Sequence, residues 1–154
     1  MSLQKYKQKR NFERTPEPKE SKAKKKSDGL VYAIQRHEAS HLHFDLRLEE
    51  EGVLKSWAIP KPPPEKEGIR RLAVETEDHP LGYEDFEGII PKGEYGAGRV
   101  ETWDKGTYIQ VESGPAKKVI ILQGDRLNGR YCLIKLKSAD PKDKNWLFFK
   151  LKTP

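Results

Sequence analysis

The chain has 154 residues and a formal net charge of +6, and its hydrophobic and charged residues are nearly equal in number, at 34% and 35%. This length suits one domain with a hydrophobic core and is too short for two comfortable domains, and the polar composition favours two-faced antiparallel strands over a doubly wound sheet. The single cysteine, Cys132, excludes an intramolecular disulfide, and no apolar run is long enough to span a bilayer. We therefore expect a cytoplasmic protein with no membrane partner.

The positive charge is concentrated in the first 28 residues. They contain ten Lys/Arg and four Asp/Glu, whereas the rest of the chain has twenty of each. A basic arm can neutralise DNA phosphates, although a lysine-rich tail is more often a solvated linker. The run ESKAKKKSDG (20–29) is typical of a flexible connector, and RNFERTPEP (10–18) is expected to dock back onto the fold. We divide the chain into an arm and linker at 1–28 and a folded domain at 29–154.

From Leu30 onward, short β-like runs alternate with turns rich in glycine and proline. Segments such as PKPPP, IIPKGEYGAG and DKG mark the breaks, and no segment shows helical periodicity over three turns. The expected strands lie at 30–35, 42–49, 53–59, 71–77, 98–104, 107–112, 117–124, 130–137 and 146–152. The sequence therefore predicts an all-β fold, a small closed or nearly closed antiparallel barrel of roughly eight strands.

Three of the four histidines lie within seven positions of the segment RHEASHLHFDLRLEEEG (36–52). From residue 41 to 49, Leu and Phe alternate with polar residues, so one strand face should be apolar and the other should carry imidazole, carboxylate and guanidinium groups. His43 and Asp45 are typical ligands of a transition metal, and Arg47 is a forked donor suited to phosphate or carboxylate. The pattern indicates an anionic substrate beside a metal, which His37 also reaches if the EAS segment bends.

The fourth histidine, His79, lies in the acidic segment VETEDHPLGYEDFEG (74–88), with Tyr83 four positions later. Nearby carboxylates favour the charged imidazole, so we expect a cationic His79 that can act as a general acid or stabilise a transition state. The plain alternative is a solvated, turn-rich loop without chemistry.

Several motifs taken together resemble the 3′-phosphoesterase domain of bacterial DNA ligase D. They are RHEASHLHFDLRLE, SWAIPK, EDHPLGYEDFEG, IIPKGEYGAGRVETWDKGTY, LNGRYCLIKLK and KNWLFFK, in the family's order from about Tyr6 to Leu151. No ligase or polymerase module accompanies them, so we expect a stand-alone member. The resemblance implies a small β-barrel with a polar, crescent-shaped cavity that acts on DNA 3′ ends with a divalent metal, typically Mn²⁺.

The resemblance also implies the reaction. Family members remove a 3′-terminal ribonucleotide from a primer-template by a phosphodiesterase step and then remove the remaining 3′-phosphate. The resulting 3′-OH suits a polymerase and a ligase, which would here be separate partners in non-homologous end joining.

The resemblance assigns roles residue by residue. His37, His43 and Asp45 match the metal ligands. Arg47 and His79 match the residues that hold the scissile phosphate, with Tyr83 close to it and Glu77 in support. Further polar positions match residues of the arm or of the site lining, namely Arg10, Glu17, Gln35, Lys61 and Arg71. The chain departs from the family at Asn11, where the family has an aspartate. The resemblance assigns no role to His41, which stays a candidate for supporting the ligands.

Two other functions fit parts of this pattern. Two histidines and a carboxylate also form the facial triad of a non-haem iron oxygenase, which would show strict Fe(II) dependence and oxygen uptake. A non-catalytic DNA-end-binding module would bind DNA through the basic arm, and its histidines would be structural residues. Such a module would still bind DNA in the presence of a metal chelator. For the phosphoesterase, Zn²⁺ or Co²⁺ would bind the mixed nitrogen and oxygen ligands at least as tightly as Mn²⁺ in vitro.

Overall fold

The computed structural model describes residues 3–21, 29–138, 140 and 142–152. The predicted connector at 20–29 therefore falls largely outside the described residues. A short helix, α1 (Gln4–Gln8), lies in the arm, and a 3₁₀ turn, η2 (Tyr83–Asp85), follows the fourth strand. The strands are β1 (Leu30–Glu38), β2 (Leu42–Glu50), β3 (Val53–Ile59), β4 (Arg70–Pro80), β5 (Gly88–Ile90), β6 (Gly98–Ser113), β7 (Lys117–Gln123), β8 (Asn128–Lys135) and β9 (Asn145–Lys150).

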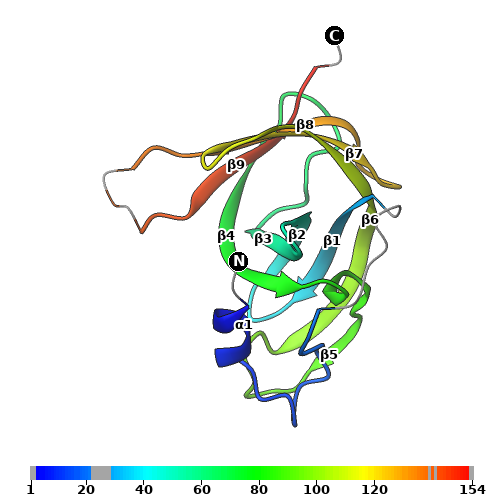
Figure 1. Cartoon of the computed structure of the whole chain (residues 1–154), viewed down its shortest axis with the longest axis vertical. Coiled ribbons are helices and arrows are strands. Elements are labelled where there is room, and N and C mark those ends of the chain that lie inside the picture. Colours follow the sequence, from blue (N-terminus) through cyan, green and yellow to red (C-terminus); the bar gives the residue numbers. More distant parts are fainter. Residues whose placement is uncertain (1–2, 22–28, 139, 141, 153–154) are drawn as a thin grey trace.

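The strands form an antiparallel barrel (Figure 1). Their order is β1-β2-β3-β4-β9-β8-β7-β6-β5, and β1 also pairs with β6, which closes eight strands into a ring. β5 is an additional strand on the first half of β6, and β7 pairs with the second half. The structure thus confirms the predicted all-β barrel of roughly eight strands. In the described part of the chain, no helix has the length and apolar character needed to cross a membrane.

Two strand predictions need correction. The break expected at DKG does not occur, because β6 continues through Gly106, which pairs with Tyr32 of β1. A Cβ atom at Gly106 would lie 2.0 Å from the carbonyl oxygen of Gln123, so this glycine permits close strand approach and does not make a turn. β5 was not predicted, because three residues are too few to show an alternating pattern.

The barrel interior holds one hydrophobic core, to which each of the eight barrel strands contributes. On β2, Phe44, Leu46 and Leu48 face this core, as the alternation predicts. Leu42 does not, because it lies at the start of the strand and is 42% exposed. The inward side chains of β2 therefore stabilise the barrel by packing in its core.

The outer face of β2 and β3 is also covered. Tyr6 from the arm packs with Leu54, Leu81 and Tyr83 in a second, smaller hydrophobic cluster outside the barrel. In Figure 1 the blue arm crosses the end of the molecule opposite the C-terminus. Most outward residues of β2 are consequently buried as well, and Arg47 is only 3% exposed, whereas His43 near the start of the strand is half-buried.

Candidate active site

A cavity of about 230 Å³ lies between the outer face of the barrel and the arm. Side chains from the arm, from β1 to β4, and from the segment between β4 and β6 line it together. The lining residues are Arg10, Glu17, His37, His43, Asp45, Arg47, Ala58, Thr76, Glu77, His79, Tyr83, Ile90 and Tyr95. Every residue predicted for the site is among them except Gln35, Lys61 and Arg71.

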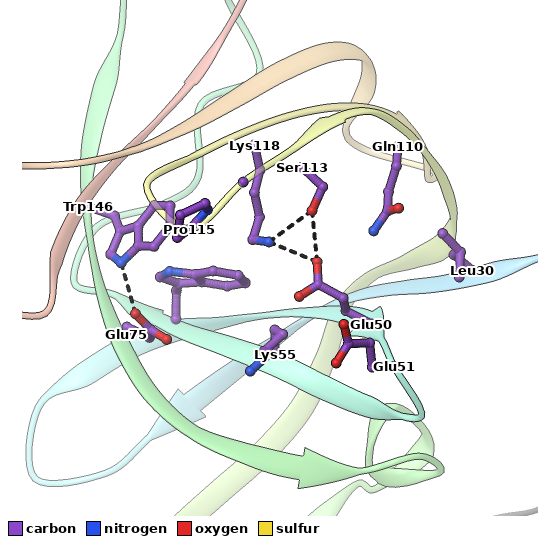
Figure 2. Close-up of a pocket in the computed structure, with 12 residues that line it drawn as sticks. Leu30, Glu50, Glu51, Lys55, Glu75, Gln110, Ser113, Pro115, Lys118 and Trp146 are labelled. Carbon is purple, nitrogen blue, oxygen red and sulfur yellow. Dashed lines mark hydrogen bonds and ion pairs between the residues drawn. The ribbon is translucent and has the colours of Figure 1, made fainter. Parts of the chain in front are cut away.

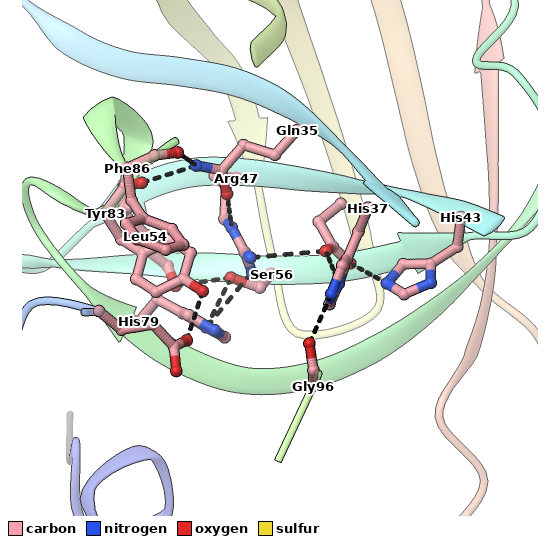
Figure 3. Close-up of polar contacts among 12 residues, drawn as sticks. Gln35, His37, His43, Arg47, Leu54, Ser56, His79, Tyr83, Phe86 and Gly96 are labelled. Atoms are coloured by element: carbon pink, nitrogen blue, oxygen red, sulfur yellow. Dashed lines mark hydrogen bonds and ion pairs between the residues drawn. The ribbon is translucent and has the colours of Figure 1, made fainter. Parts of the chain in front are cut away.

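His37 and His43, which Figure 3 shows side by side, meet Asp45 at one side of this cavity. One ligand atom from each lies within 4.8 Å of the others. The Nδ1 atom of His37 is 3.5 Å from Asp45 Oδ2, and the Nε2 atom of His43 is 3.2 Å from Asp45 Oδ1. The pairing of β1 with β2 brings these side chains together, because it places His37 directly opposite His43.

The second nitrogen of each histidine is held by a backbone carbonyl. His37 Nε2 lies 2.7 Å from the Gly96 oxygen, and His43 Nδ1 lies 3.1 Å from the His41 oxygen. A carbonyl oxygen only accepts, so these nitrogens carry the protons and the other two, which face Asp45, can offer lone pairs. Two imidazole nitrogens and a carboxylate oxygen in this arrangement fit a divalent transition metal. His41 contributes its backbone, and its side chain is exposed.

Asp45 is ionised despite its burial. Burial favours the neutral acid, but Arg47 and the two histidines outweigh this effect and hold the pKa of Asp45 well below its usual range. The Nη2 atom of Arg47 lies 3.6 Å from Asp45 Oδ2. For His43, burial lowers the pKa, yet the hydrogen bond and charge of Asp45 raise it overall. The carboxylate needed for metal binding is thus present at neutral pH.

Arg47 is oriented from behind by Gln35. Gln35 is completely buried; its Oε1 accepts a hydrogen bond of 3.1 Å from Arg47 Nε, and its Nε2 donates to the carbonyls of Tyr83 at 2.7 Å and Phe86 at 3.1 Å. The guanidinium also lies over the Tyr83 ring, 4.9 Å from its centroid. Gln35 therefore positions Arg47. It was expected to line the cavity, and it does not.

His79 lines the cavity and is 4% exposed. Its Nδ1 atom is 2.9 Å from the Glu77 carbonyl oxygen, 3.3 Å from Arg47 Nη1 and 3.4 Å from Ser56 Oγ. Burial first, then the charges of Arg47 and Arg10, lower the pKa of His79 well below its ordinary value. The predicted cationic His79 is therefore wrong for the substrate-free site, where the imidazole is neutral.

The acidic neighbours of His79 in sequence interact elsewhere, which explains this error. Glu75 accepts a hydrogen bond of 3.0 Å from Trp146 Nε1, and Asp78 pairs with Lys55 at 3.3 Å. Glu84 accepts from the backbone N–H of Gly82 at 2.6 Å. Alternation along β4 turns Asp78 away from the imidazole, and the irregular pairing of β4 with β3 between His79 and Thr76 places Glu75 on the opposite face as well.

Arg10 ties the arm to the cavity. Its Nε atom lies 2.9 Å from Glu17 Oε1 and its Nη1 atom 3.4 Å from Glu77 Oε2. The hydroxyl of Tyr83 donates to Glu17, and the Arg10 guanidinium lies 4.5 Å from the centroid of the Tyr6 ring. Burial and Glu17 raise the pKa of Tyr83 well above its usual value, so the phenol stays protonated. The arm therefore forms one wall of the cavity through buried ion pairs.

Lys61 and Arg71 do not reach the cavity in this structure. Lys61 is exposed after β3, and Arg71 Nε donates a 2.8 Å hydrogen bond to the carbonyl of Pro62. Asn11 is exposed too; its side-chain oxygen accepts from the Glu13 N–H at 3.1 Å and so shapes the turn after α1. These residues lie near the site's supporting segments and not on its surface.

Sequence reasoning missed Ser56, Tyr95 and Gly96. Ser56 is the one hydroxyl in the apolar strand VLKSWAI, and its outward position was the only available signal. Tyr95 and Gly96 lie in a segment that the sequence marks as a turn and that the family resemblance covers without giving either residue a role. Their contacts with the arm and with His37 depend on tertiary structure, which spacing alone does not show.

A larger cavity of about 520 Å³ lies between the β2–β3 hairpin, the β6–β7 turn and the start of β9 (Figure 2). Its polar groups largely satisfy one another: Lys118 Nζ donates to Glu50 at 2.8 Å and to Ser113 at 3.3 Å, while Trp146 Nε1 bonds Glu75. Within the described ranges, the only cluster of potential metal ligands is the one formed by His37, His43 and Asp45. The larger of the two cavities is therefore not the one that contains the candidate metal ligands.

Comparisons with known proteins identify the family. Residues 35–135 match the model of the DNA ligase D 3′-phosphoesterase domain. The multifunctional non-homologous end joining protein LigD of Pseudomonas aeruginosa is 46% identical over 156 residues, which cover 97% of this chain and 18% of that protein.

Mycobacterial relatives give the same result. The multifunctional non-homologous end joining DNA repair protein LigD of Mycobacterium tuberculosis is 42% identical over 154 residues, covering 97% of this chain and 20% of its own length. The LigD protein of Mycolicibacterium smegmatis is 41% identical over 158 residues, with 96% and 20% covered. The chain thus spans about a fifth of the length of these relatives, and it belongs to the family of DNA ligase D 3′-phosphoesterase domains.

Proposed function

We propose that this protein is a metal-dependent DNA 3′-end-healing phosphoesterase. It would remove a 3′-terminal ribonucleotide as a phosphodiesterase and a 3′-phosphate as a phosphomonoesterase, leaving a 3′-OH for repair by non-homologous end joining. The observation that carries this proposal is the shared cavity, in which the cluster of His37, His43 and Asp45 lies beside Arg47 and His79. Family membership supports the choice of DNA 3′ ends as substrate.

His37, His43 and Asp45 would hold the metal, for which we propose Mn²⁺. A metal bound there supplies Lewis-acid neutralisation of phosphate charge and activates water. The mixed nitrogen and oxygen ligands would also accept Co²⁺ or Zn²⁺ in vitro. The backbone carbonyls of His41 and Gly96 keep the two imidazoles in the required orientation.

Arg47 would bind the phosphate oxygens and stabilise the charge that develops during phosphoryl transfer. Gln35 already occupies its Nε atom, so the substrate would be bound through the two terminal nitrogens, which face the cavity beside His79 and Asp45. Positioning and charge stabilisation provide most of the catalysis in this class of reaction. Because Gln35 fixes the guanidinium in advance, little reorganisation is needed when substrate binds.

His79 would exchange a proton with an oxygen of the reacting phosphate ester. Its Nδ1 atom is surrounded by Glu77, Arg47 and Ser56, which leaves Nε2 for the substrate. A bound phosphate adds negative charge and thereby favours protonation of the neutral imidazole. His79 can therefore take up a proton as substrate binds and donate it to the leaving oxygen.

The arm would complete the site and contact DNA. Arg10, Glu17 and Tyr83 close one side of the cavity and limit the access of water. The positive charge of residues 1–28 would attract the phosphate backbone of a primer-template. A separate polymerase and ligase would then use the healed end.

The direct test is a primer-template with a single 3′ ribonucleotide, incubated with the protein and Mn²⁺, with and without EDTA. We expect the terminal ribonucleoside to be lost first and the 3′-phosphate next, with both steps abolished by EDTA and by His43→Ala. Release that persists in EDTA would rule out the metal mechanism. Oxygen uptake with Fe(II) would instead favour an oxygenase, and DNA-end binding without cleavage would favour the non-catalytic module.

A further inference from the structure

The loop of residues 91–97, PKGEYGA, contacts a metal-ligand candidate directly. The carbonyl of Gly96 accepts the 2.7 Å hydrogen bond from His37 Nε2. Gly96 has a φ of +76°, and a Cβ atom there would lie 3.5 Å from His37 Cε1, so the loop backbone packs against the imidazole. Hydrogen bonds from Glu94 N to Pro91 O and from Ala97 N to Glu94 O, both 3.1 Å, fix the loop's shape.

The neighbouring residue, Tyr95, contacts the arm. Its ring centroid is 4.7 Å from Lys9 Nζ and 4.8 Å from Arg10 Cζ, and its hydroxyl lies 3.3 Å from Lys9 Nζ. Glu94 of the same loop lies 3.5 Å from Arg14. Tyr95 is 48% exposed, so these cation contacts and not core burial hold its ring in place.

Arm, loop and His37 therefore form one continuous chain of contacts. We propose that Tyr95 is a positioning residue that couples docking of the arm to the orientation of His37, through the carbonyl of Gly96. Docking of the arm then raises the affinity for the metal, and metal binding in turn holds the arm on the cavity, because coupling between two sites is reciprocal. This inference rests on the proposed metal-dependent function.

Tyr95 is a suitable place to break this coupling, because the arm has other attachments. Arg10 also pairs with Glu17 and Glu77, and Tyr6 is buried in the cluster outside the barrel. Loss of the Tyr95 ring should therefore leave the arm docked and remove the loop's contacts with Lys9 and Arg10, so that loop and arm stay joined only by the pair of Glu94 with Arg14, whose side chain is 59% exposed. The expected result is altered metal binding in a protein that keeps its fold.

The experiment compares the full chain with Tyr95→Leu, Tyr95→Phe and Ile109→Ala. Phe keeps the ring that faces the cations, and Ile109 is a 50% exposed residue of β6 outside the site. We expect Tyr95→Leu to weaken Mn²⁺ binding in calorimetric titrations by about fivefold or more, a typical size for coupling between sites. Tyr95→Phe should keep most of the affinity, and Ile109→Ala all of it.

Amide hydrogen exchange of residues 4–17 provides the reciprocal measurement. Mn²⁺ should slow this exchange in the unaltered chain and should not slow it in Tyr95→Leu, with circular dichroism confirming the fold of each variant. Unchanged Mn²⁺ affinity in Tyr95→Leu, or undiminished protection of its arm, would overturn the coupling. If the unaltered chain bound no Mn²⁺, the proposed metal site itself would be refuted. Failure of the metal site is thus distinguishable from failure of the coupling through Tyr95, in which the unaltered chain still binds Mn²⁺.

Discussion

Arg47 illustrates how one side chain depends on another for its direction. Gln35 uses both ends of its amide to join Arg47 to the carbonyls of Tyr83 and Phe86. A lysine at position 47 would keep the charge but could not bind Gln35 and a phosphate through a planar fork.

We therefore expect Arg47→Lys to lower kcat/KM about 100-fold or more on a 3′-phosphate primer, a typical loss when one charge-stabilising donor is removed. Arg99→Lys, at an exposed position of β6, serves as the matched control and should have normal activity. Steady-state kinetics of both variants provide the measurement. Equal activity of the two variants would contradict the role assigned to Arg47.

His79 should make the stability of the metal-free protein sensitive to pH. Its pKa in the folded protein is below the ordinary value of 6.5, so the unfolded chain binds more protons between these two values. The free energy of unfolding should therefore fall as the pH drops from about 7 to about 5. In His79→Asn this dependence should be shallower, as urea unfolding at several pH values would show; parallel curves for the two proteins would refute the assignment.

At the level of elements, β2 divides its residues between fold and chemistry. Leu46 faces the barrel core, whereas its neighbour Asp45 faces the cavity. We expect Leu46→Ala to lower the free energy of unfolding by about 2–5 kcal/mol, as is usual for a buried leucine.

Asp45→Asn should abolish metal-dependent cleavage, while its circular dichroism spectrum should stay that of the native protein. Measurable turnover by this variant would contradict the assignment of Asp45 as a metal ligand.

The arm combines packing with charge, so its contribution to DNA binding is best tested without deleting it. Lys5 and Lys19 are exposed, and their replacement by Gln leaves the buried Tyr6 in place. Each lysine that neutralises a phosphate contributes about one unit to the salt dependence of binding.

The double variant Lys5→Gln/Lys19→Gln should therefore lower the slope of log K against log salt by up to about two, measured in EDTA with a primer-template. Lys137→Gln/Lys152→Gln makes the same charge change at exposed positions just after β8 and β9, and Figure 1 shows these two strands at the end of the molecule opposite the arm. Equal slopes for the two double variants would show that the arm has no special role in binding DNA.

Alternation and turn residues were sufficient to predict most strands and to place His43, Asp45 and Arg47 on one face of a single strand, whereas His37 was assigned through the family resemblance. The break at Gly106 was wrong, since glycine serves close strand approach as well as turns. The predicted positive charge of His79 was also wrong, because residues close in sequence are not the ones that surround the imidazole. The carboxylate of Asp78 points away from it, and the nearby cation Arg47 lies 32 positions earlier in the chain. Contacts of this kind require the fold to be known.

At the scale of the whole molecule, metal binding should stabilise the barrel. Anything that binds only the folded state adds to the free energy of unfolding, by about 2.7 kcal/mol at 100 times the dissociation constant. Mn²⁺ should thus raise the melting temperature, EDTA should reverse the rise, and His43→Ala should show neither effect. Differential scanning calorimetry provides the measurement, and an unchanged response in His43→Ala would place the metal elsewhere.

The use of both faces of β2 makes the chain far more sensitive to changes of length than to changes of side chain. Deleting one residue at the start of this strand would turn Asp45 and Arg47 toward the hydrocarbon interior and Leu46 toward the cavity. A substitution, by contrast, alters one face and leaves the other intact. New specificity on this barrel should therefore arise more readily from exchanges of outward side chains than from insertions or deletions within its strands.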